Sequence, residues 1–189
     1  MQLWVGLGNP GPSYAMHRHN VGFMAADIIA DVHDFAAPRK QFQGWVQDGR
    51  IGANKIVLLK PATFMNESGL AIRAALDFYK LAAEDVTVFH DELDLAPLKL
   101  KVKRGGGTAG QNGLRSAVAH IGDAFRRVRI GIGHPGHKDR VTGHVLSNWH
   151  KTEIEPLTDL LGAIAAEAPW LADGDDARFM NEIALRLQN

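Results

Sequence analysis

Two short segments carry the side chains best suited to acid–base chemistry. The first contains His19 within His17-Arg18-His19-Asn20, and the second reads His-Asp-Glu-Leu-Asp over residues 90–94. A carboxylate that accepts a hydrogen bond from Nδ1–H of a histidine fixes the tautomer of the ring and leaves Nε2 free to take a proton from water. The second segment follows an apolar stretch at 86–89, and sites in α/β proteins lie at the carboxyl ends of such strands. The pattern therefore indicates a histidine general base with a carboxylate partner.

Both segments also have simpler interpretations. A lone histidine is usually structural, and His17 together with His19 could form half of a metal site. The acidic residues of 90–94 could merely solvate a loop, although that is hard to argue for all three of them. The run His134-Pro135-Gly136-His137 contains possible metal ligands, but it has no carboxylate at helical spacing. A metal site is therefore the weaker interpretation.

Three asparagines, Asn9, Asn66 and Asn112, each lie between an expected strand and an expected helix. Asparagine is well suited to capping the start of a helix. Neutral amides can also orient a substrate carbonyl and a water molecule, or donate to a developing oxyanion. The sequence leaves both roles open, and one residue can serve both.

Two glycine-rich stretches could bind phosphate groups. Residues 6–11 fit the G-x-G-x-x-G fingerprint of dinucleotide-binding proteins, but Pro10 and Pro12 make an early helix awkward and the helical pattern begins only near residue 20. The run 105–110 could cradle a phosphate through backbone N–H groups or act as a flexible gate. It is not a P-loop because no Gly-Lys-Ser/Thr follows, and no serine lies in a G-x-S-x-G motif.

The elements that must position these residues alternate between strand and helix. This alternation predicts one α/β domain over residues 1–189, with a mixed, twisted sheet covered by helices on both faces. A polar loop rich in histidine and glycine is expected at 133–147. Strands are expected at 2–7, 44–51, 54–60, 86–89, 98–103 and 127–132. Helices are expected at about 20–32, 67–80 and 112–121, in a region whose apolar face spans 157–168, and at 176–187.

Composition narrows the classes of partner. The chain has 189 residues and no cysteine, so it has no disulfide framework and no thiol nucleophile. No apolar stretch approaches the roughly 20 residues of a membrane span, and the N-terminus lacks the basic region of a signal peptide, so we expect a cytoplasmic protein. The net charge is +0, but segment 96–140 has ten basic and two acidic residues, whereas segment 151–189 has three basic and eight acidic. This asymmetry indicates one face that meets a polyanion.

Six motifs, in this order along the chain, together resemble the bacterial peptidyl-tRNA hydrolase family. The resemblance runs from about residue 3 to about residue 150 and implies a monomeric α/β enzyme that needs no cofactor and no metal. Such an enzyme hydrolyses the ester between a peptide and the 3′ ribose of tRNA, and so recycles tRNA from stalled or dropped-off peptidyl-tRNA. The motifs are GLGNPGPSY (6–14), RHNVG (18–22), KPATFMNESG (60–69), HDELDL (90–95), KVKRGGGTAGQNGLRS (101–116) and RVRIGIGHPG (127–136).

The resemblance also implies roles for individual residues. It places the general base on His19 and the carboxylate partner on Asp91. Asn9 would recognise the first carbonyl of the peptide and so distinguish peptidyl from free aminoacyl substrates. Asn66 and Asn112 would hold the ester carbonyl or the attacking water, which puts all five of these residues in the catalytic site.

The resemblance extends to substrate contacts. Tyr14 and Phe64 would join Asn66 and Asn112 in lining the site for the peptide and the tRNA 3′ end. Lys103 and Arg129 match positions that grip the 5′ phosphate at the acceptor stem, in agreement with the basic segment.

Two positions depart from the family pattern. Many relatives have histidine where Gln111 stands, and aromatic residues where His144 stands. Glutamine can form hydrogen bonds but cannot titrate, so a proton relay through position 111 is in doubt. A non-catalytic RNA-binding protein of the same fold and a dinucleotide-dependent oxidoreductase are the alternative functions.

Overall fold

Seven strands form one mixed sheet in the computed structural model, which describes residues 1–189. The strand order is β2-β3-β4-β1-β5-β7-β6; β1 is parallel to β4 and β5, β5 is parallel to β7, and the remaining pairs are antiparallel. The predicted mixed sheet is thereby confirmed. The strands are β1 (Gln2–Gly6), β2 (Arg39–Gln41), β3 (Gly44–Ile51), β4 (Asn54–Pro61), β5 (Val86–Glu92), β6 (Leu100–Arg104) and β7 (Arg126–Gly131).

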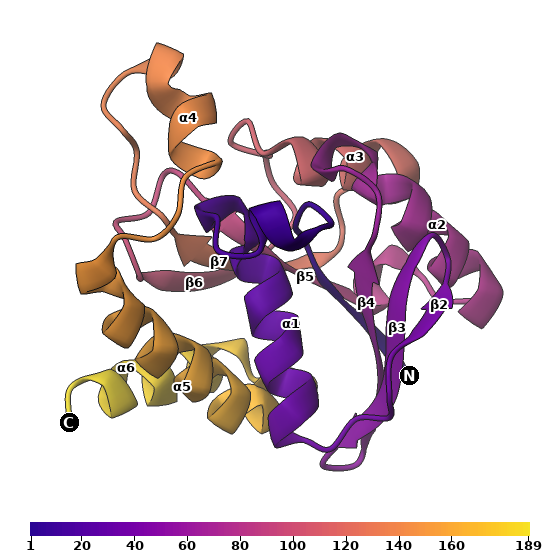
Figure 1. Ribbon diagram of the computed structural model, residues 1–189. Coiled ribbons are helices and arrows are strands. Elements are labelled where there is room, and N and C mark those ends of the chain that lie inside the picture. The colour runs from indigo at the N-terminus through magenta and orange to yellow at the C-terminus, as the bar shows by residue number, and fades with distance from the viewer.

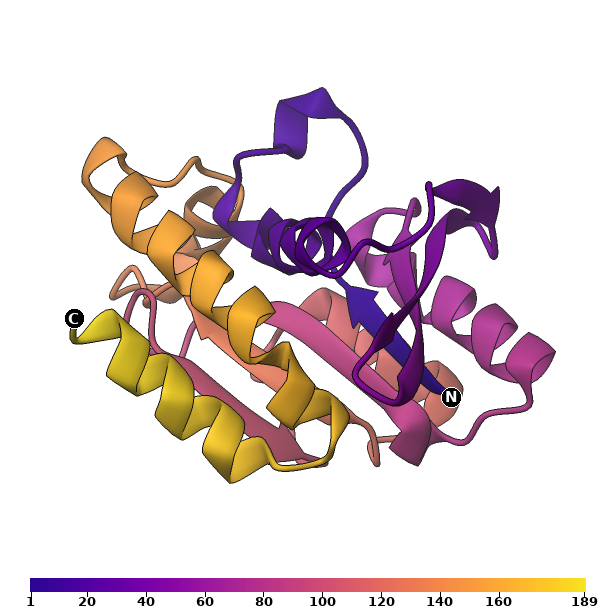
Figure 2. The ribbon, with the colours of Figure 1, turned by 90° about the horizontal axis from the view of Figure 1, so that it is seen from below.

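Helices cover both faces of the sheet, as predicted (Figures 1 and 2). Successive side chains of a strand point to opposite faces. In β1, Trp4 therefore packs with α1, α5 and α6, whereas Leu3 and Val5 pack with α2 and α3. The helices are α1 (Val21–Val32), α2 (Ser68–Tyr79), α3 (Asn112–Ile121), α4 (Val141–Val145), α5 (Ile154–Ala172) and α6 (Asp176–Leu187).

The structure corrects three expectations about element boundaries. Strand β2 was not predicted, because it has only three polar residues and pairs at the edge of the sheet with β3. Strand β5 does not end at residue 89 but continues to Glu92, since its pairing with β7 extends to Glu92 and Gly131. The expected loop at 133–147 contains α4, which at five residues is too short to show helical periodicity.

The parallel strands β1, β4, β5 and β7 all have their carboxyl ends on the same side of the sheet, as their registers require. This side is called the carboxyl edge of the sheet below. The loop after β1, the glycine-rich loop before α3, and α4 gather at this edge (Figure 1). Strand β3 runs the other way and places Trp45 opposite Lys60 of β4 at the same edge. Segments distant in sequence therefore meet there. None of the helices has the length and apolar character needed to cross a membrane.

Candidate active site

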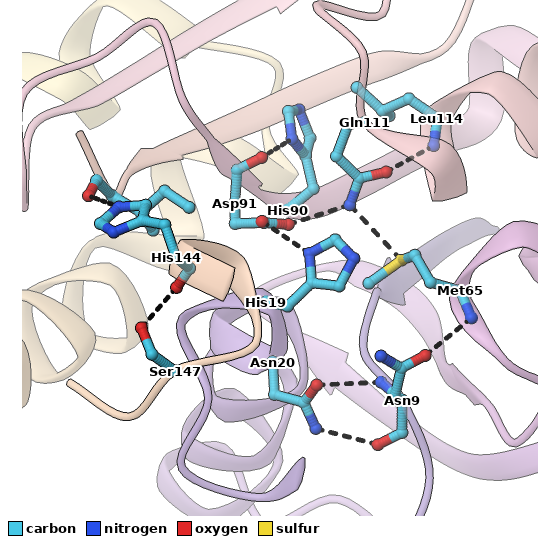
Figure 3. A network of polar contacts seen from close by, with 11 residues as sticks. Asn9, His19, Asn20, Met65, His90, Asp91, Gln111, Leu114, His144 and Ser147 are labelled. Atoms are coloured by element: carbon cyan, nitrogen blue, oxygen red, sulfur yellow. Dashed lines mark hydrogen bonds and ion pairs between the residues drawn. The ribbon is translucent and has the colours of Figure 1, made fainter. Parts of the chain in front are cut away.

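His19 and Asp91 form a hydrogen-bonded pair at the carboxyl edge of the sheet (Figure 3). His19 lies in a 3₁₀ turn (Arg18–Asn20) directly before α1, and Asp91 is the penultimate residue of β5. The Nδ1 atom of His19 lies 2.7 Å from Oδ2 of Asp91, although the residues are 72 positions apart. The carboxylate accepts from Nδ1–H, and Nε2 of His19 has no hydrogen-bond partner within the protein. This arrangement leaves a lone pair on Nε2 available for a proton.

A close approach of α1 to the sheet makes the pairing possible. Gly22 lies in the first turn of α1, and a Cβ atom at this position would overlap the backbone oxygen atoms of Phe89 and Leu7. Because glycine has no side chain there, the start of α1 sits directly against β1 and β5. The residues just before the helix, His19 among them, are therefore brought to the end of β5.

Gln111 holds the other oxygen of Asp91. Its Nε2 donates to Oδ1 of Asp91 at 2.9 Å, while its Oε1 accepts from the backbone N–H of Leu114 at 2.8 Å (Figure 3). The second bond makes Gln111 the N-cap of α3. One amide therefore starts a helix and orients the carboxylate, a role that was not predicted from the sequence.

Asn9 is held by three hydrogen bonds, one to its side-chain amide and two to its backbone. Its Oδ1 accepts from the backbone N–H of Met65 at 2.8 Å. The side chain of Asn20 bridges the backbone N–H and C=O of Asn9, each at 2.9 Å. The Nδ2 group of Asn9 has no partner in the protein, so the free end of this amide is a donor. Asn20 was not predicted as a site residue, and its position next to His19 was the one available signal.

His19 and Asp91 are here called the dyad. A hollow of about 260 Å³, named the dyad hollow, opens in front of them. Helix α4 contributes the apolar side chains of Val141 and Val145 to its wall, and the glycine-rich loop contributes Ala109 and Gly110. Tyr14, Lys103 and Arg129 do not line it. Six residues predicted from the sequence do: Asn9, His19, Phe64, Asn66, Asp91 and Asn112.

Comparison with known proteins identifies the family of this chain. The model of the peptidyl-tRNA hydrolase family matches residues 3–189. The chain belongs to this family. It is 78% identical to the peptidyl-tRNA hydrolase of Sphingopyxis alaskensis over 188 residues and 73% identical to that of Rhizorhabdus wittichii over 187 residues, with 99–100% of each chain covered.

A solved structure agrees with this membership. The crystal structure of peptidyl-tRNA hydrolase from Acinetobacter baumannii superposes with a TM-score of 0.91 at 40% identity, covering 97% of this chain and 94% of that one. The expectation of a hydrolytic enzyme that acts on peptidyl-tRNA is confirmed by these matches. The two alternative functions, a non-catalytic RNA-binding protein and an oxidoreductase, find no support among them.

The two remaining predicted amides, Asn66 and Asn112, face solvent at the dyad hollow. Asn66 lies in a 3₁₀ turn (Met65–Glu67), and Asn112 is the first residue of α3. Neither side chain caps a helix, so the capping interpretation is wrong for both. Phe64 is 56% exposed beside them and makes an edge-to-face contact with Tyr14, whose ring centroid lies 6.2 Å away. Tyr14 therefore lies behind Phe64, outside the hollow.

The predicted phosphate-binding residues occupy neighbouring strands on the other side of the dyad. Nε of Arg129 donates to Oε1 of Glu92 at 2.9 Å, and Glu92 lines the dyad hollow. The two terminal nitrogens of this guanidinium remain free to donate. Lys103 is exposed on β6, and its Nζ reaches back over Gly106 of the glycine-rich loop.

Two other arginines of the basic segment are not on the surface. Arg126 is buried and donates to Asp176 at 2.9 Å and to the backbone oxygen of Leu171. Arg127 is also buried and donates to the backbone oxygen atoms of Gly106 and Gly107. The charge count of segment 96–140 therefore overstates the positive surface by two, because sequence alone does not separate structural from exposed arginine.

His90, next to the dyad residue Asp91, is not suited to proton transfer. Its Nδ1–H donates to the backbone oxygen of Asp91 at 2.8 Å, and its Nε2 is buried without a partner. Burial lowers the pKa of His90 because the charged ring would lose its hydration. The ring therefore stays neutral and remote from solvent. No group of three or more histidine, aspartate or glutamate side chains is arranged to hold a metal ion.

Proposed function

We propose that His19 is the general base that activates water for hydrolysis of peptidyl-tRNA, with Asp91 as its positioning partner. One observation carries the proposal: Nδ1 of His19 is bonded to Asp91 at 2.7 Å while Nε2 is unpartnered in a ring that lines the dyad hollow. A ring held in this tautomer can accept a proton only at Nε2. A water molecule between Nε2 and the ester carbonyl would therefore be deprotonated as it attacks.

The reaction follows from this placement. The water oxygen bonds to the ester carbonyl carbon while its proton moves to Nε2 of His19, and the Asp91 carboxylate stabilises the resulting imidazolium. The tetrahedral intermediate then breaks its bond to the 3′ ribose oxygen. That oxygen recovers the proton from Nε2, which regenerates the neutral base and releases tRNA and free peptide.

The amides take complementary roles in this proposal. Asn66 and Asn112 hold the ester carbonyl or the water and donate to the oxyanion as it forms. The free Nδ2 donor of Asn9 recognises the first carbonyl of the peptide, a group that a free aminoacyl ester lacks. Phe64, backed by Tyr14, provides an apolar surface for the 3′ end.

In this proposal the tRNA body lies over β6 and β7. Lys103 and Arg129 bind the 5′ phosphate of the acceptor stem, and the pairing of Arg129 with Glu92 through Nε keeps its terminal nitrogens in place for this contact. The enzyme acts as a monomer in the cytoplasm and requires no cofactor. Its product is deacylated tRNA for reuse in translation.

Replacing His19 by alanine tests the proposed base. Turnover of N-acetyl-aminoacyl-tRNA by His19→Ala should fall by about two to four decades, the range for loss of a general base, while tRNA affinity stays close to that of the unaltered protein. Release of the blocked amino acid and a filter-binding measurement give the two quantities. His137→Ala, which removes an exposed ring that does not line the dyad hollow, is the matched control. Turnover by His19→Ala within a few-fold of the unaltered protein would reject His19 as the base.

A further inference from the structure

A second hollow of about 240 Å³ lies beside the dyad hollow, and Asn9 lines both. Neither His19 nor Asp91 borders this second hollow. Its walls come from the loop after β1, from the start of α1, from the start of β3 and from the end of β4: Pro10, Phe23, Met24, Trp45 and Lys60. The roles proposed above leave it unassigned.

The order of the strands gives the direction in which the substrate must run. The proposed phosphate contacts lie on β6 and β7, the dyad carboxylate on β5, Asn9 directly after β1, and the second hollow at the end of β4 and the start of β3. These strands are consecutive neighbours in the sheet. If tRNA enters over β6 and β7 and its ester reaches β5, the peptide must continue past Asn9 toward β4 and β3. The second hollow is the next depression on that path.

We infer that the second hollow is a subsite for the peptide residue that precedes the esterified one. This inference rests on the proposed function, because it takes the ester to lie at His19 and the first peptide carbonyl at Asn9. An amide at Asn9 that binds this carbonyl would leave the preceding residue at the border between the two hollows.

The chemistry of the walls fits an apolar or aromatic side chain. Trp45 is 39% exposed on β3 and lines the second hollow. Phe23 adds a second ring. The two ammonium groups nearby are already engaged, since Lys40 stacks on Trp45 at 5.3 Å and Lys60 pairs with Asp27 at 2.6 Å. Because the charge of Lys60 is paired with Asp27 and two aromatic rings line the walls, the hollow favours a neutral, flat side chain over an ionised one.

Two substrates that differ only in length test the subsite. N-acetyl-aminoacyl-tRNA supplies the carbonyl for Asn9 but no preceding residue, whereas an N-acetyl-Phe-aminoacyl-tRNA with the same esterified amino acid places a ring next to Trp45. For Trp45→Ala, kcat/KM should fall about fivefold to tenfold on the longer substrate and stay unchanged on the shorter one. Trp45→Phe retains a ring and should keep most of the activity on the longer substrate.

Phe78→Ala, which removes a 62% exposed ring on α2 away from both hollows, is the matched control and should change neither value. Activity on the shorter substrate also reports whether Trp45→Ala is folded. Equal values of kcat/KM for Trp45→Ala and the unaltered protein on the longer substrate, or equal losses on both substrates, would overturn the subsite and leave the dyad proposal intact. Failure of the unaltered protein to hydrolyse either substrate would overturn both.

Discussion

The candidate site joins one histidine to a carboxylate whose two oxygens are both engaged. Asp91 is 2% exposed and accepts from His19 through Oδ2 and from Gln111 through Oδ1. A buried carboxylate without such donors would be costly, because it has left water. The two donors offset that cost and fix the plane of the carboxylate. The tautomer and orientation of His19 therefore depend on a neutral amide as well as on the charged partner.

Gln111→Glu separates the two functions of this amide. Glutamate keeps the length of the side chain and an oxygen acceptor for the N–H of Leu114, but it loses the donor to Asp91 and places a second carboxylate against it. Hydrogen bonds to charged groups contribute about 1.5–3 kcal/mol, so turnover should fall by roughly one to two decades. Single-turnover hydrolysis of N-acetyl-aminoacyl-tRNA gives the rate, and a thermal melt shows whether α3 is retained.

Gln111→His is the control, because histidine retains a donor for Asp91 and should stay within a few-fold of the unaltered rate. If Gln111→Glu turned over as fast as the unaltered protein, the bond between Gln111 and Asp91 would have no part in orienting the base.

The sequence allowed the pairing of His19 with Asp91 to be predicted, but not the bonds that support this pair. His19 could be singled out because it comes just before the helical pattern that begins near residue 20. Asp91 could be singled out because it comes just after the apolar stretch at 86–89. The supporting bonds of Asn20 and Gln111 are not visible, because they join residues 11 and 20 positions apart whose distance depends on how α1 and α3 pack. The roles proposed for Asn66 and Asn112 remain predictions.

At the level of elements, the last three residues of β5 serve three different purposes. His90 is buried, Asp91 meets His19, and Glu92 holds Arg129 across from β7. Because the strand continues to Glu92, these side chains are fixed by backbone pairing rather than by a flexible loop. The end of β5 therefore connects the dyad to the proposed phosphate-binding residue through a rigid backbone.

Burial of His90 should make the free energy of unfolding depend on pH. Its pKa is lowered in the folded protein, so below the ordinary value of 6.5 the unfolded chain takes up a proton that the folded chain does not. The contribution is complete above pH 6.5 and declines as the pH falls below it, by at most ~1.4 kcal/mol per pH unit for one proton. Urea unfolding of the unaltered protein and of His90→Asn at pH 7.5 and 5.5 measures this difference.

The asparagine variant retains an amide donor for the backbone but has no group that titrates in this range. Its free energy of unfolding should therefore fall less between the two pH values, by about 1 kcal/mol. Identical pH dependence in the two proteins would show that His90 does not resist protonation in the folded state.

Element prediction succeeded where periodicity or turn residues were strong. The hairpin of β3 and β4 has its turn at the expected residues, and α3 and α6 have the expected bounds. The short elements β2 and α4 were missed because a three-residue edge strand and a five-residue helix leave no periodic pattern. Since α4 forms one wall of the dyad hollow, the shape of the site could not be obtained from the sequence.

Over the whole molecule, a net charge of +0 hides an ordered arrangement. Two arginines of the basic segment are structural, whereas the exposed Lys103 and the partly exposed Arg129 lie on adjacent strands at one end of the sheet. The dyad lies in the middle, and the second hollow lies toward β3 and β4. Polyanion and peptide would therefore bind on opposite sides of the reacting bond.

Removing either basic side chain should weaken tRNA binding in a salt-dependent way. Each lost phosphate contact means fewer counterions released, so log affinity against log salt concentration should become shallower by roughly one for Lys103→Ala or Arg129→Ala. Binding of deacylated tRNA at several salt concentrations gives the slope. Lys55→Ala, at the opposite end of β4, should not change it. A slope equal to that of the unaltered protein would place both side chains outside the tRNA interface.

If His19 is the base, the rate of hydrolysis must depend on pH in a way that a merely structural histidine would not produce. A proton on Nε2 blocks the base, so the single-turnover rate of N-acetyl-aminoacyl-tRNA hydrolysis should fall tenfold per pH unit on the acid side of a single ionisation. The residual rate of His19→Ala should lack this ionisation. If His19→Ala kept the same acid limb at a lower rate, the group that loses its proton to start the reaction would lie elsewhere in the site.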